Sequence, residues 1–262
     1  MIGFIGGGNM AEALIKGMTS QGMRDILVSE PRKERRRFLE QTYRVRTTPS
    51  NREAAAECSL IILAVKPQNM SAVLDEITDV VTEDKTVVSI AAGIPLSSLE
   101  EKLRTRKLVR VMPNTPAIVQ EGMSVLSLCE CLPGKEIAAV REVFLSVGKV
   151  LTLPERHMNA VTAVSGSGPA FIALFVEAMR DAGVHLGLAK EHAGELAVQT
   201  LLGTARLLET GISPEKLREM VTSPGGTTAA GLQVFDGKGL KDITAEALLA
   251  ALKRAEELGA RK

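Results

Sequence analysis

The first eleven residues of the chain limit its possible fold more than any other stretch. An apolar run over Ile2–Ile5 predicts a buried strand, and Gly6-Gly7-Gly8 ends that run abruptly. Residues 9–18 then show the 3.6-residue spacing of an amphipathic helix. A strand, a glycine turn and a helix N-terminus together form an anion site. We therefore expect the opening βα unit of a dinucleotide-binding domain, in preference to a plain tight turn.

The small residues of this turn have separate expected roles. Gly6 permits the tight turn, Gly8 lets the backbone approach a pyrophosphate, and Ala11 keeps helix and strand close. The resulting pattern, G-x-G-x-x-A, is weak alone and gains weight from its position between a strand and a helix.

Apolar runs followed by turns recur along the first half of the chain. The predicted strands after the first are residues 25–29, 60–65, 86–90, 108–112, 123–128 and 149–153, with helical spacing between most of them. Such alternation specifies a doubly wound α/β sheet, whose ligands lie beyond the carboxyl ends of its strands. The turns at Gly6, Ser29, Lys66-Pro67-Gln68, Ala91-Ala92-Gly93 and Pro113-Asn114-Thr115 all occupy such ends. They predict one binding crevice.

The turn at residues 29–32 bears on the cofactor. Glu30 lies about where an acidic residue accepts from an adenine-ribose hydroxyl, whereas Ser29 and Arg32 suit a 2′-phosphate. The sequence therefore leaves NAD and NADP both open. Pro31 is expected to open the next helix, which runs to about Gln41. We interpret the basic run 32–37 as a solvated helix face in preference to a phosphate patch.

Charge and cysteine content exclude several classes of protein. With 32 basic and 31 acidic residues, the chain has no global field to attract nucleic acid or an anionic membrane. Three cysteines argue for a reducing compartment, and we expect Cys129 and Cys131 to be packing residues with no metal site. No apolar run approaches the ~20 residues of a bilayer span, and the first strand leaves no room for a targeting peptide. We expect a soluble, cytoplasmic protein.

The strands stop past Pro154, and helical periodicity takes over. We expect residues 1–153 to form the dinucleotide-binding domain and residues 154–262 an all-helical domain for substrate binding and dimerisation. The expected helices are residues 159–184, 189–208, 214–221, 228–236 and 245–257. The first is apolar nearly all round at residues 170–176, so it must be buried, and a small helical layer offers little cover. A homodimer or larger oligomer is therefore expected.

Two segments of the helical half depart from this pattern. Residues 165–171 set two glycines and a proline against an apolar helix, and residues 222–229 join two helices through Gly225-Gly226. Exposed amides there, with hydroxyls at Ser223, Thr227 and Thr228, would suit a carboxylate. A capped loop without a ligand fits the same residues equally well. The three histidines, His157, His185 and His192, are expected on helix surfaces or ends.

These segments complete a resemblance to a known family. The motifs, in order, are Phe4-Ile-Gly-Gly-Gly-Asn-Met-Ala11, Ala64-Val-Lys-Pro-Gln68, Arg110-Val-Met-Pro-Asn-Thr-Pro116, Ser165-Gly-Ser-Gly-Pro-Ala170 and Ser223-Pro-Gly-Gly-Thr-Thr228. Together they resemble pyrroline-5-carboxylate reductases over nearly the whole chain. The resemblance implies reduction of the cyclic imine 1-pyrroline-5-carboxylate to L-proline with NADPH or NADH, the last step of proline synthesis.

The resemblance also implies site residues. Those implied to hold the cofactor are Gly6, Gly8, Asn9 and Met10 at the pyrophosphate, Ser29, Arg32 and Asn51 at the adenine ribose, and Ala64, Lys66, Pro67, Ala92 and Asn114 at the nicotinamide. Those implied to hold the substrate carboxylate and ring nitrogen are Ser223, Gly226, Thr227 and Thr228, with Thr228 as the catalytic hydroxyl.

The chemistry fits the absence of a clear acid. A protonated imine is already an electrophile, so hydride addition depends mainly on positioning. The first alternative is a β-hydroxyacid dehydrogenase, which would be expected to carry a lysine on the long helix. Residues 165–171 contain none. The second is a non-catalytic NAD(P) sensor.

Overall fold

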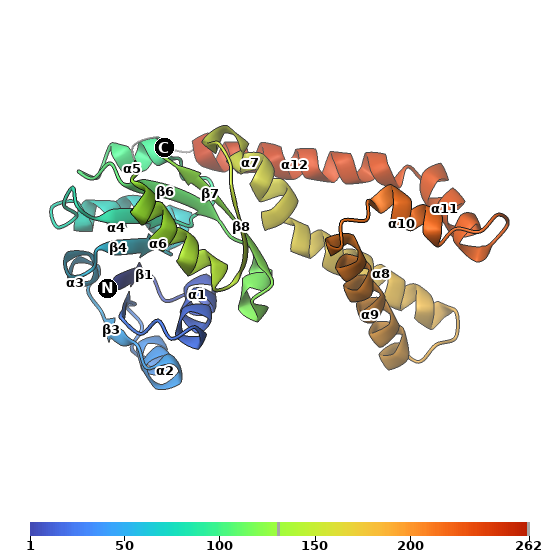
Figure 1. The fold of residues 1–262 in the computed structure, drawn as a ribbon, viewed down its shortest axis with the longest axis horizontal. Helices are drawn as coiled ribbons and strands as arrows, with labels where there is room; N and C mark the ends of the chain where they lie inside the picture. Colours follow the sequence, from blue (N-terminus) through green and yellow to red (C-terminus); the bar gives the residue numbers. More distant parts are fainter. Residues whose placement is uncertain (130–131, 261–262) are drawn as a thin grey trace. The chain divides into compact units, whose positions relative to one another are not determined.

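A computed structural model describes residues 1–129 and 132–260 (Figure 1). The chain divides into two compact units, one of residues 1–167 with 251–262 and one of residues 168–250. The boundary predicted at 153/154 follows the last strand, which ends at Thr152. The next residues, 155–167, pack on the first unit, where Met158 and Val161 lie against Val125.

The first unit contains a sheet of eight strands in the order β3-β2-β1-β4-β5-β6-β7-β8. Its strands are β1 Ile2–Ile5, β2 Ile26–Ser29, β3 Arg46–Thr48, β4 Leu60–Leu63, β5 Thr86–Ser89, β6 Leu108–Met112, β7 Gly122–Leu128 and β8 Gly148–Thr152. Neighbouring strands run parallel except β6 and β7, which pair antiparallel. The predicted doubly wound α/β sheet is confirmed.

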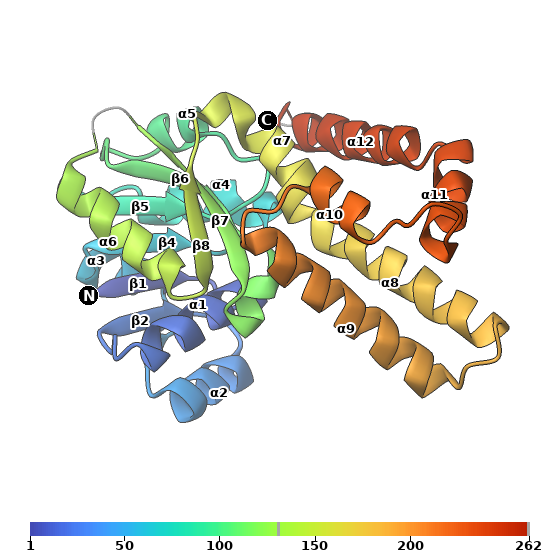
Figure 2. The same ribbon diagram turned by 45° about the vertical axis from the view of Figure 1, so that its right-hand side comes forward.

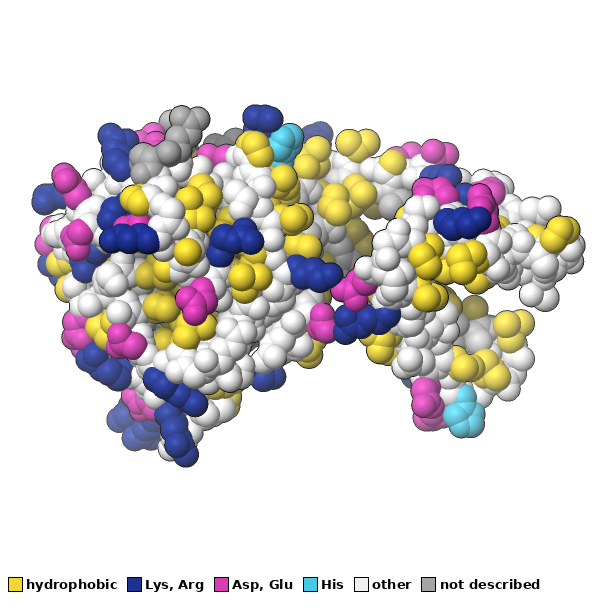
Figure 3. All heavy atoms as spheres, viewed as in Figure 1, with side chains coloured by type: hydrophobic (Ala, Val, Ile, Leu, Met, Phe, Trp, Pro, Cys, Tyr) yellow, Lys and Arg dark blue, Asp and Glu magenta, His cyan; other side chains and the backbone are white. Residues whose placement is uncertain are grey.

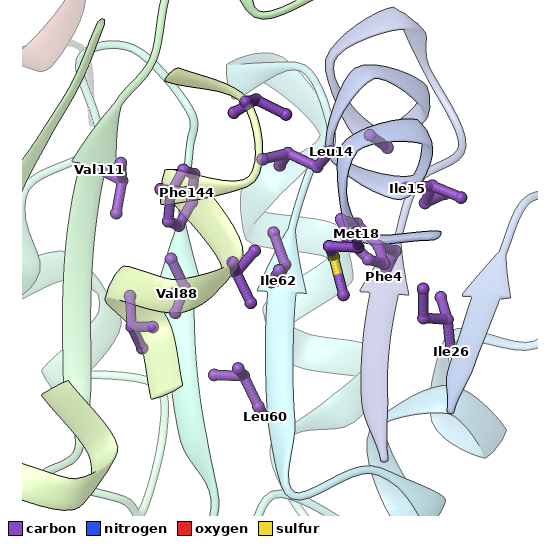
Figure 4. Packing of buried hydrophobic residues seen from close by; sticks show 14 of the residues in the cluster. Phe4, Leu14, Ile15, Met18, Ile26, Leu60, Ile62, Val88, Val111 and Phe144 are labelled. Carbon is purple, nitrogen blue, oxygen red and sulfur yellow. The ribbon is translucent and has the colours of Figure 1, made fainter. Parts of the chain in front are cut away.

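Helices cover both faces of the sheet, and this explains its continuous apolar strands. One face carries α1 Asn9–Ser20, α2 Lys33–Tyr43 and α6 Gly134–Leu145, and the other carries α3 Asn51–Glu57, α4 Met70–Ile77 and α5 Leu96–Glu100. Alternate residues of each strand enter opposite cores. Phe4 and Ile62 meet Leu14 and Met18 of α1 on the first face (Figure 4), whereas Ile61 faces the second.

Three local expectations were wrong or incomplete around the second strand. The helix expected to open at Pro31 begins at Lys33, because the Glu30 carboxylate accepts the Arg32 amide at 3.0 Å and keeps Arg32 extended. Strand β3 and helix α3 were not predicted. β3 is short and polar, and it forms by pairing with β2 at the sheet edge. The start of α3 had a sequence signal, since Ser50 caps it by accepting from the Glu53 amide at 3.2 Å.

The segment leading out of the sheet is an interrupted helix. The single helix expected from residue 159 divides into η3 Glu155–His157, α7 Met158–Val161, a π-helical turn at Thr162–Gly166, and α8 Gly168–His185. Ser167 donates its amide to the Thr162 carbonyl at 2.8 Å, which marks the wider turn. Such turns are rare and occur often at functional sites. This turn accounts for the glycines and proline that break the apolar pattern.

The second unit is helical. After α8 it contains α9 Lys190–Glu209, α10 Pro214–Met220, α11 Thr227–Gly237 and most of α12, which spans Leu240–Ala260. The α12 bounds are wider than the predicted 245–257, and the others agree closely. Helices α8 and α9 lie side by side as an antiparallel pair (Figure 2). The predicted all-helical second half is confirmed.

Apolar side chains of the second unit remain exposed to an unusual degree. No residue of α8 is buried, and Leu174 is 64% exposed. Figure 3 shows apolar side chains on the surface of these helices. The helical run 155–185 has the length and composition of a membrane-spanning helix, with only 6% of its apolar window buried. The expectation that no apolar run approaches such a span was wrong by length and composition, because the successive helical elements of residues 155–185 add up to a run of that length. Both observations show a large exposed apolar surface on these helices.

The described cysteines and the three histidines lie in the kinds of position that the sequence predicts. Cys58 is a buried free thiol, and Cys129 packs against the first core. Cys131 lies outside the described residues. His157, His185 and His192 are all exposed on helices or at helix ends, as expected.

Candidate functional site

A crevice of about 450 Å³ opens beyond the carboxyl ends of β1 and β4. These strands are neighbours at the centre of the sheet, where the order of connection reverses, so the crevice occupies the topological switch point. Its lining residues are Gly8, Asn9, Met10, Arg32, Ala64, Val65, Lys66, Pro67, Ile90, Ala91, Ala92 and Pro113. The structure therefore brings together most of the residues expected at a dinucleotide.

The glycine turn forms the wall of the crevice on the β1 side. Gly6 has φ +101°, and a Cβ there would lie 2.8 Å from the Ala64 carbonyl oxygen, so only glycine fits. Gly8 is different, because a Cβ at this position meets nothing within 4 Å. Gly8 caps α1 without a side-chain hydrogen bond, which leaves the first amides of the helix available to an anion.

Glu30, the residue directly after β2, contacts the glycine turn. Its carboxylate accepts the Gly7 amide at 3.1 Å, the Arg32 amide at 3.0 Å and the Arg32 Nε at 2.8 Å. Burial alone would raise the pKa of Glu30, but the hydrogen bonds from Arg32 and Gly7 outweigh it and lower the pKa. With a side chain only 5% exposed and these donors in place, Glu30 has little capacity left for a ribose hydroxyl.

The other residues expected at the adenine ribose lie together beside it. Ser29 is fully buried and donates its hydroxyl to Asn51 Oδ1 at 2.7 Å, and Asn51 Nδ2 donates to Glu76 at 2.8 Å. Arg32 is 65% exposed and reaches the crevice. Of these three, Arg32 is therefore the one placed to meet a phosphate, while Ser29 orients Asn51.

The expected nicotinamide side is made by the turns after β4 and β5. Ala64, Lys66, Pro67 and Ala92 line the crevice. Asn114 does not: its Nδ2 donates to the Ser165 carbonyl and hydroxyl, both at 3.2 Å, and its Oδ1 accepts the Met123 amide at 2.8 Å. Its expected contact with the cofactor stays a prediction. Ala91 and Pro113 also line the crevice and belong to turns that were predicted to form it, and the remaining lining residues, Val65 and Ile90, are direct neighbours of predicted ones.

The basic run 32–37 is not a uniform solvated face. Lys33 and Arg37 are exposed, whereas Arg35 and Arg36 turn back onto the preceding loops. Arg36 Nη1 donates to the Glu30 and Pro31 carbonyls at 2.7 and 2.9 Å. Arg35 Nε donates to the Gly7 carbonyl at 2.6 Å. No sequence pattern indicates these contacts, because they depend on where α2 lies against the turn.

The substrate loop expected at residues 223–228 lies in the second unit and enters α11. Gly226 is the N-cap, so Thr227 and Thr228 are the first two helical residues, and the helix starts one residue earlier than predicted. Gly226 occupies the N-cap position, so Thr228 is not the N-cap residue of the helix. Ser223 faces Gly226, whose amide donates to the Ser223 carbonyl at 3.0 Å. The first-turn amides of α11 and these hydroxyls together offer donors for a carboxylate.

Residues 1–129 and 132–260 contain no group of three or more His, Cys, Asp or Glu that could hold a metal ion.

Comparison with known proteins decides the family. A curated pyrroline-5-carboxylate reductase from Synechocystis sp. is 42% identical, and the alignment covers 98% of both chains. This chain belongs to the pyrroline-5-carboxylate reductase family. The family model for pyrroline-5-carboxylate reductase dimerisation matches residues 155–258, and a model for NADP oxidoreductases that depend on coenzyme F420 matches residues 1–93.

Solved pyrroline-5-carboxylate reductases have the same fold. The structure from Coxiella burnetii is 38% identical with a TM-score of 0.93, covering 98% of this chain and 97% of that one. The structure from Plasmodium falciparum, with NADP bound, is 31% identical with a TM-score of 0.89, covering 99% and 98%. The family resemblance stated from the sequence motifs is confirmed, as are the fold class and a small-molecule oxidoreductase that uses NAD(P)H.

Proposed function

We propose that this chain reduces 1-pyrroline-5-carboxylate to L-proline with NADPH or NADH. The observation that carries the proposal is similarity to pyrroline-5-carboxylate reductases along the full length of the chain. The switch-point crevice suits a dinucleotide, and the α11 N-terminus suits a carboxylate. Bound NAD(P)H would supply the hydride, and the residues of this chain would bind and orient the two reactants.

The cofactor would lie along the crevice. The open α1 N-terminus at Gly8, Asn9 and Met10, with Gly6 setting the turn, would take the pyrophosphate. Residues of the β2 turn and α3 would meet the adenosine end, and the turns after β4, β5 and β6 would meet the nicotinamide. These residues are Ser29, Arg32 and Asn51 for the former, and Ala64, Lys66, Pro67, Ala92 and Asn114 for the latter.

The substrate would be held at the start of α11. Ser223, Gly226 and Thr227 would bind the carboxylate through hydroxyls and first-turn amides. Thr228 would hydrogen-bond to the ring nitrogen. Hydride adds to the imine carbon, the C=N double bond becomes a single bond, and the nitrogen keeps its proton as the amine forms. A hydroxyl that holds this nitrogen orients the bond to be reduced.

Hydride transfer requires the reacting atoms to lie ~3–3.5 Å apart. The function therefore requires a nucleotide domain, from the same chain or from a partner, to meet the substrate loop. We propose a homodimer or larger oligomer held by the helical half, since the family model there is a dimerisation model and α8 has no buried residue. A partner would cover this apolar surface. A cytoplasmic location fits the free thiol of Cys58.

An assay of NAD(P)H consumption tests the proposal against its alternatives. Turnover with pyrroline-5-carboxylate and none with 3-hydroxyisobutyrate is the expected result. The reverse preference would identify a β-hydroxyacid dehydrogenase. Cofactor binding without turnover of either substrate would identify a sensor.

A further inference from the structure

The side chain of Arg35 donates hydrogen bonds to two carbonyl oxygens of the glycine turn. Arg35 projects from the first turn of α2 and is 18% exposed. Its Nε donates to the Gly7 carbonyl at 2.6 Å, and its Nη2 donates to the Gly8 carbonyl at 3.3 Å. The planar guanidinium thus bridges two consecutive peptide groups of the turn, which a lysine ammonium cannot do in the same way.

The guanidinium is itself fixed from two directions. Nη2 pairs with Glu12 Oε2 of α1 at 2.5 Å, and the other Glu12 oxygen accepts the Tyr43 hydroxyl at 2.7 Å. Arg35 also lies 5.1 Å from the centre of the Phe38 ring. A chain of contacts therefore runs from the end of α2, through α1, to the carbonyls of Gly7 and Gly8.

The amide group of Gly7 is also held by a side chain. Glu30 accepts the Gly7 amide, so both polar groups of Gly7 are bonded to side chains of the β2–α2 segment. Three consecutive glycines would otherwise have wide conformational freedom, and ordering them has a cost in conformational entropy. A turn fixed before binding spares the cofactor this cost.

We propose that Arg35 is a positioning residue that fixes the glycine turn in its cofactor-binding conformation. The inference rests on the proposed cofactor site at this turn. Nε and Nη2 of Arg35 are engaged by the Gly7 and Gly8 carbonyls and by Glu12, so we assign the residue a role through the backbone and not as a charge on the pyrophosphate. The amides at the start of α1, which have no acceptor within the helix, are then left to face the anion.

Arg35→Gln tests the proposal against a matched control. Arg37→Gln removes the same charge from an exposed site on the same helix. Arg35→Gln should raise the Kd of NADPH about 10-fold, a change of ~1.4 kcal/mol, while Arg37→Gln should change it less than about twofold. The kcat at saturating NADPH should change little, because only cofactor binding depends on the preset turn. Hydrogen exchange of the Gly7 and Gly8 amides should accelerate in the cofactor-free Arg35→Gln variant.

Two further variants separate positioning from charge. Arg35→Lys keeps the charge without the fork, so it should recover only part of the lost affinity. Full recovery in Arg35→Lys, or equal losses in Arg35→Gln and Arg37→Gln, would overturn the proposal. If Arg35→Gln does not fold, Glu12→Gln takes its place: a Kd about threefold higher with kcat retained supports the proposal, and an unchanged Kd overturns it.

Gly8→Val separates this inference from the cofactor site on which it rests. If NADPH binds to folded Gly8→Val as it does to the wild type, the proposed cofactor site fails first. If Gly8→Val loses NADPH and Arg35→Gln behaves like Arg37→Gln, only the positioning role fails.

Discussion

Gly8 offers a direct test of the cofactor site, because its side-chain position is open. A Cβ at Gly8 meets nothing within 4 Å, and its φ of −72° and ψ of −173° are accessible to any residue. Gly8→Val therefore places two methyl groups in the crevice wall without a clash inside the fold. Their bulk would occupy the space through which a pyrophosphate reaches the first amides of α1.

The expected magnitudes for binding and folding differ clearly. A hydrogen bond to a charged group contributes ~1.5–3 kcal/mol, so displacing the pyrophosphate from two amides would cost ~3–6 kcal/mol. The Kd for NADPH should then rise by at least about 100-fold. Valine is a poorer N-cap than glycine by about 1 kcal/mol, and the less flexible unfolded chain offsets part of that. The melting temperature should move by no more than about 4 °C.

Calorimetric titration with NADPH and a melting curve measure both quantities on the same protein. Gly134→Val is the matched control, since a Cβ at Gly134 also meets nothing within 4 Å and this residue begins α6, away from the crevice. Gly6→Ala is not a substitute: its φ of +101° and its contact with Ala64 should destabilise the fold by ~1–3 kcal/mol or more. A folded Gly8→Val protein with normal NADPH affinity would refute the assignment.

Three further outcomes are expected. In steady-state kinetics, Thr228→Ala should lower kcat about 10- to 100-fold, and Thr227→Ala should lower it less. The melting temperature should change little, because Gly226 and not Thr228 caps α11. Normal turnover in Thr228→Ala would contradict the catalytic role of Thr228. Light scattering at micromolar concentration should show a dimer or larger, since α8 is uncovered; a fully active monomer would contradict this. Burial, with the hydrogen bond to Glu12, raises the pKa of Tyr43 to about 12. This is the only tyrosine, so phenolate absorbance should show about one tenth of it ionised at pH 11. The contribution of the protonated Tyr43 to the stability of the fold should persist below pH ~10 and disappear as pH rises through about 12. Half-ionisation near pH 10 would contradict the contact.

The sequence alone determined the architecture of this protein. Apolar runs such as Leu60–Leu63 indicate a strand that is buried on both faces of a sheet, and the residues after each run indicate a turn at the carboxyl end of that strand. The residues that make up each of these signals lie within a few positions of one another, so the signal can be recognised without knowledge of the tertiary structure. The same locality placed Gly8, Lys66 and Ala92 at one crevice, because parallel strands bring their ends together.

Contacts between distant residues were decided only by the tertiary structure. β3 has no apolar run and exists because β2 offers an edge to pair with. Glu30 suited a ribose hydroxyl by its position, but folding brings it to the Gly7 amide 23 positions away. Arg35 belonged to a basic run that was interpreted as solvated, and it meets the Gly7 carbonyl across 28 positions. A polar side chain bonds to whichever partner packing brings within reach, and periodicity carries no record of that partner.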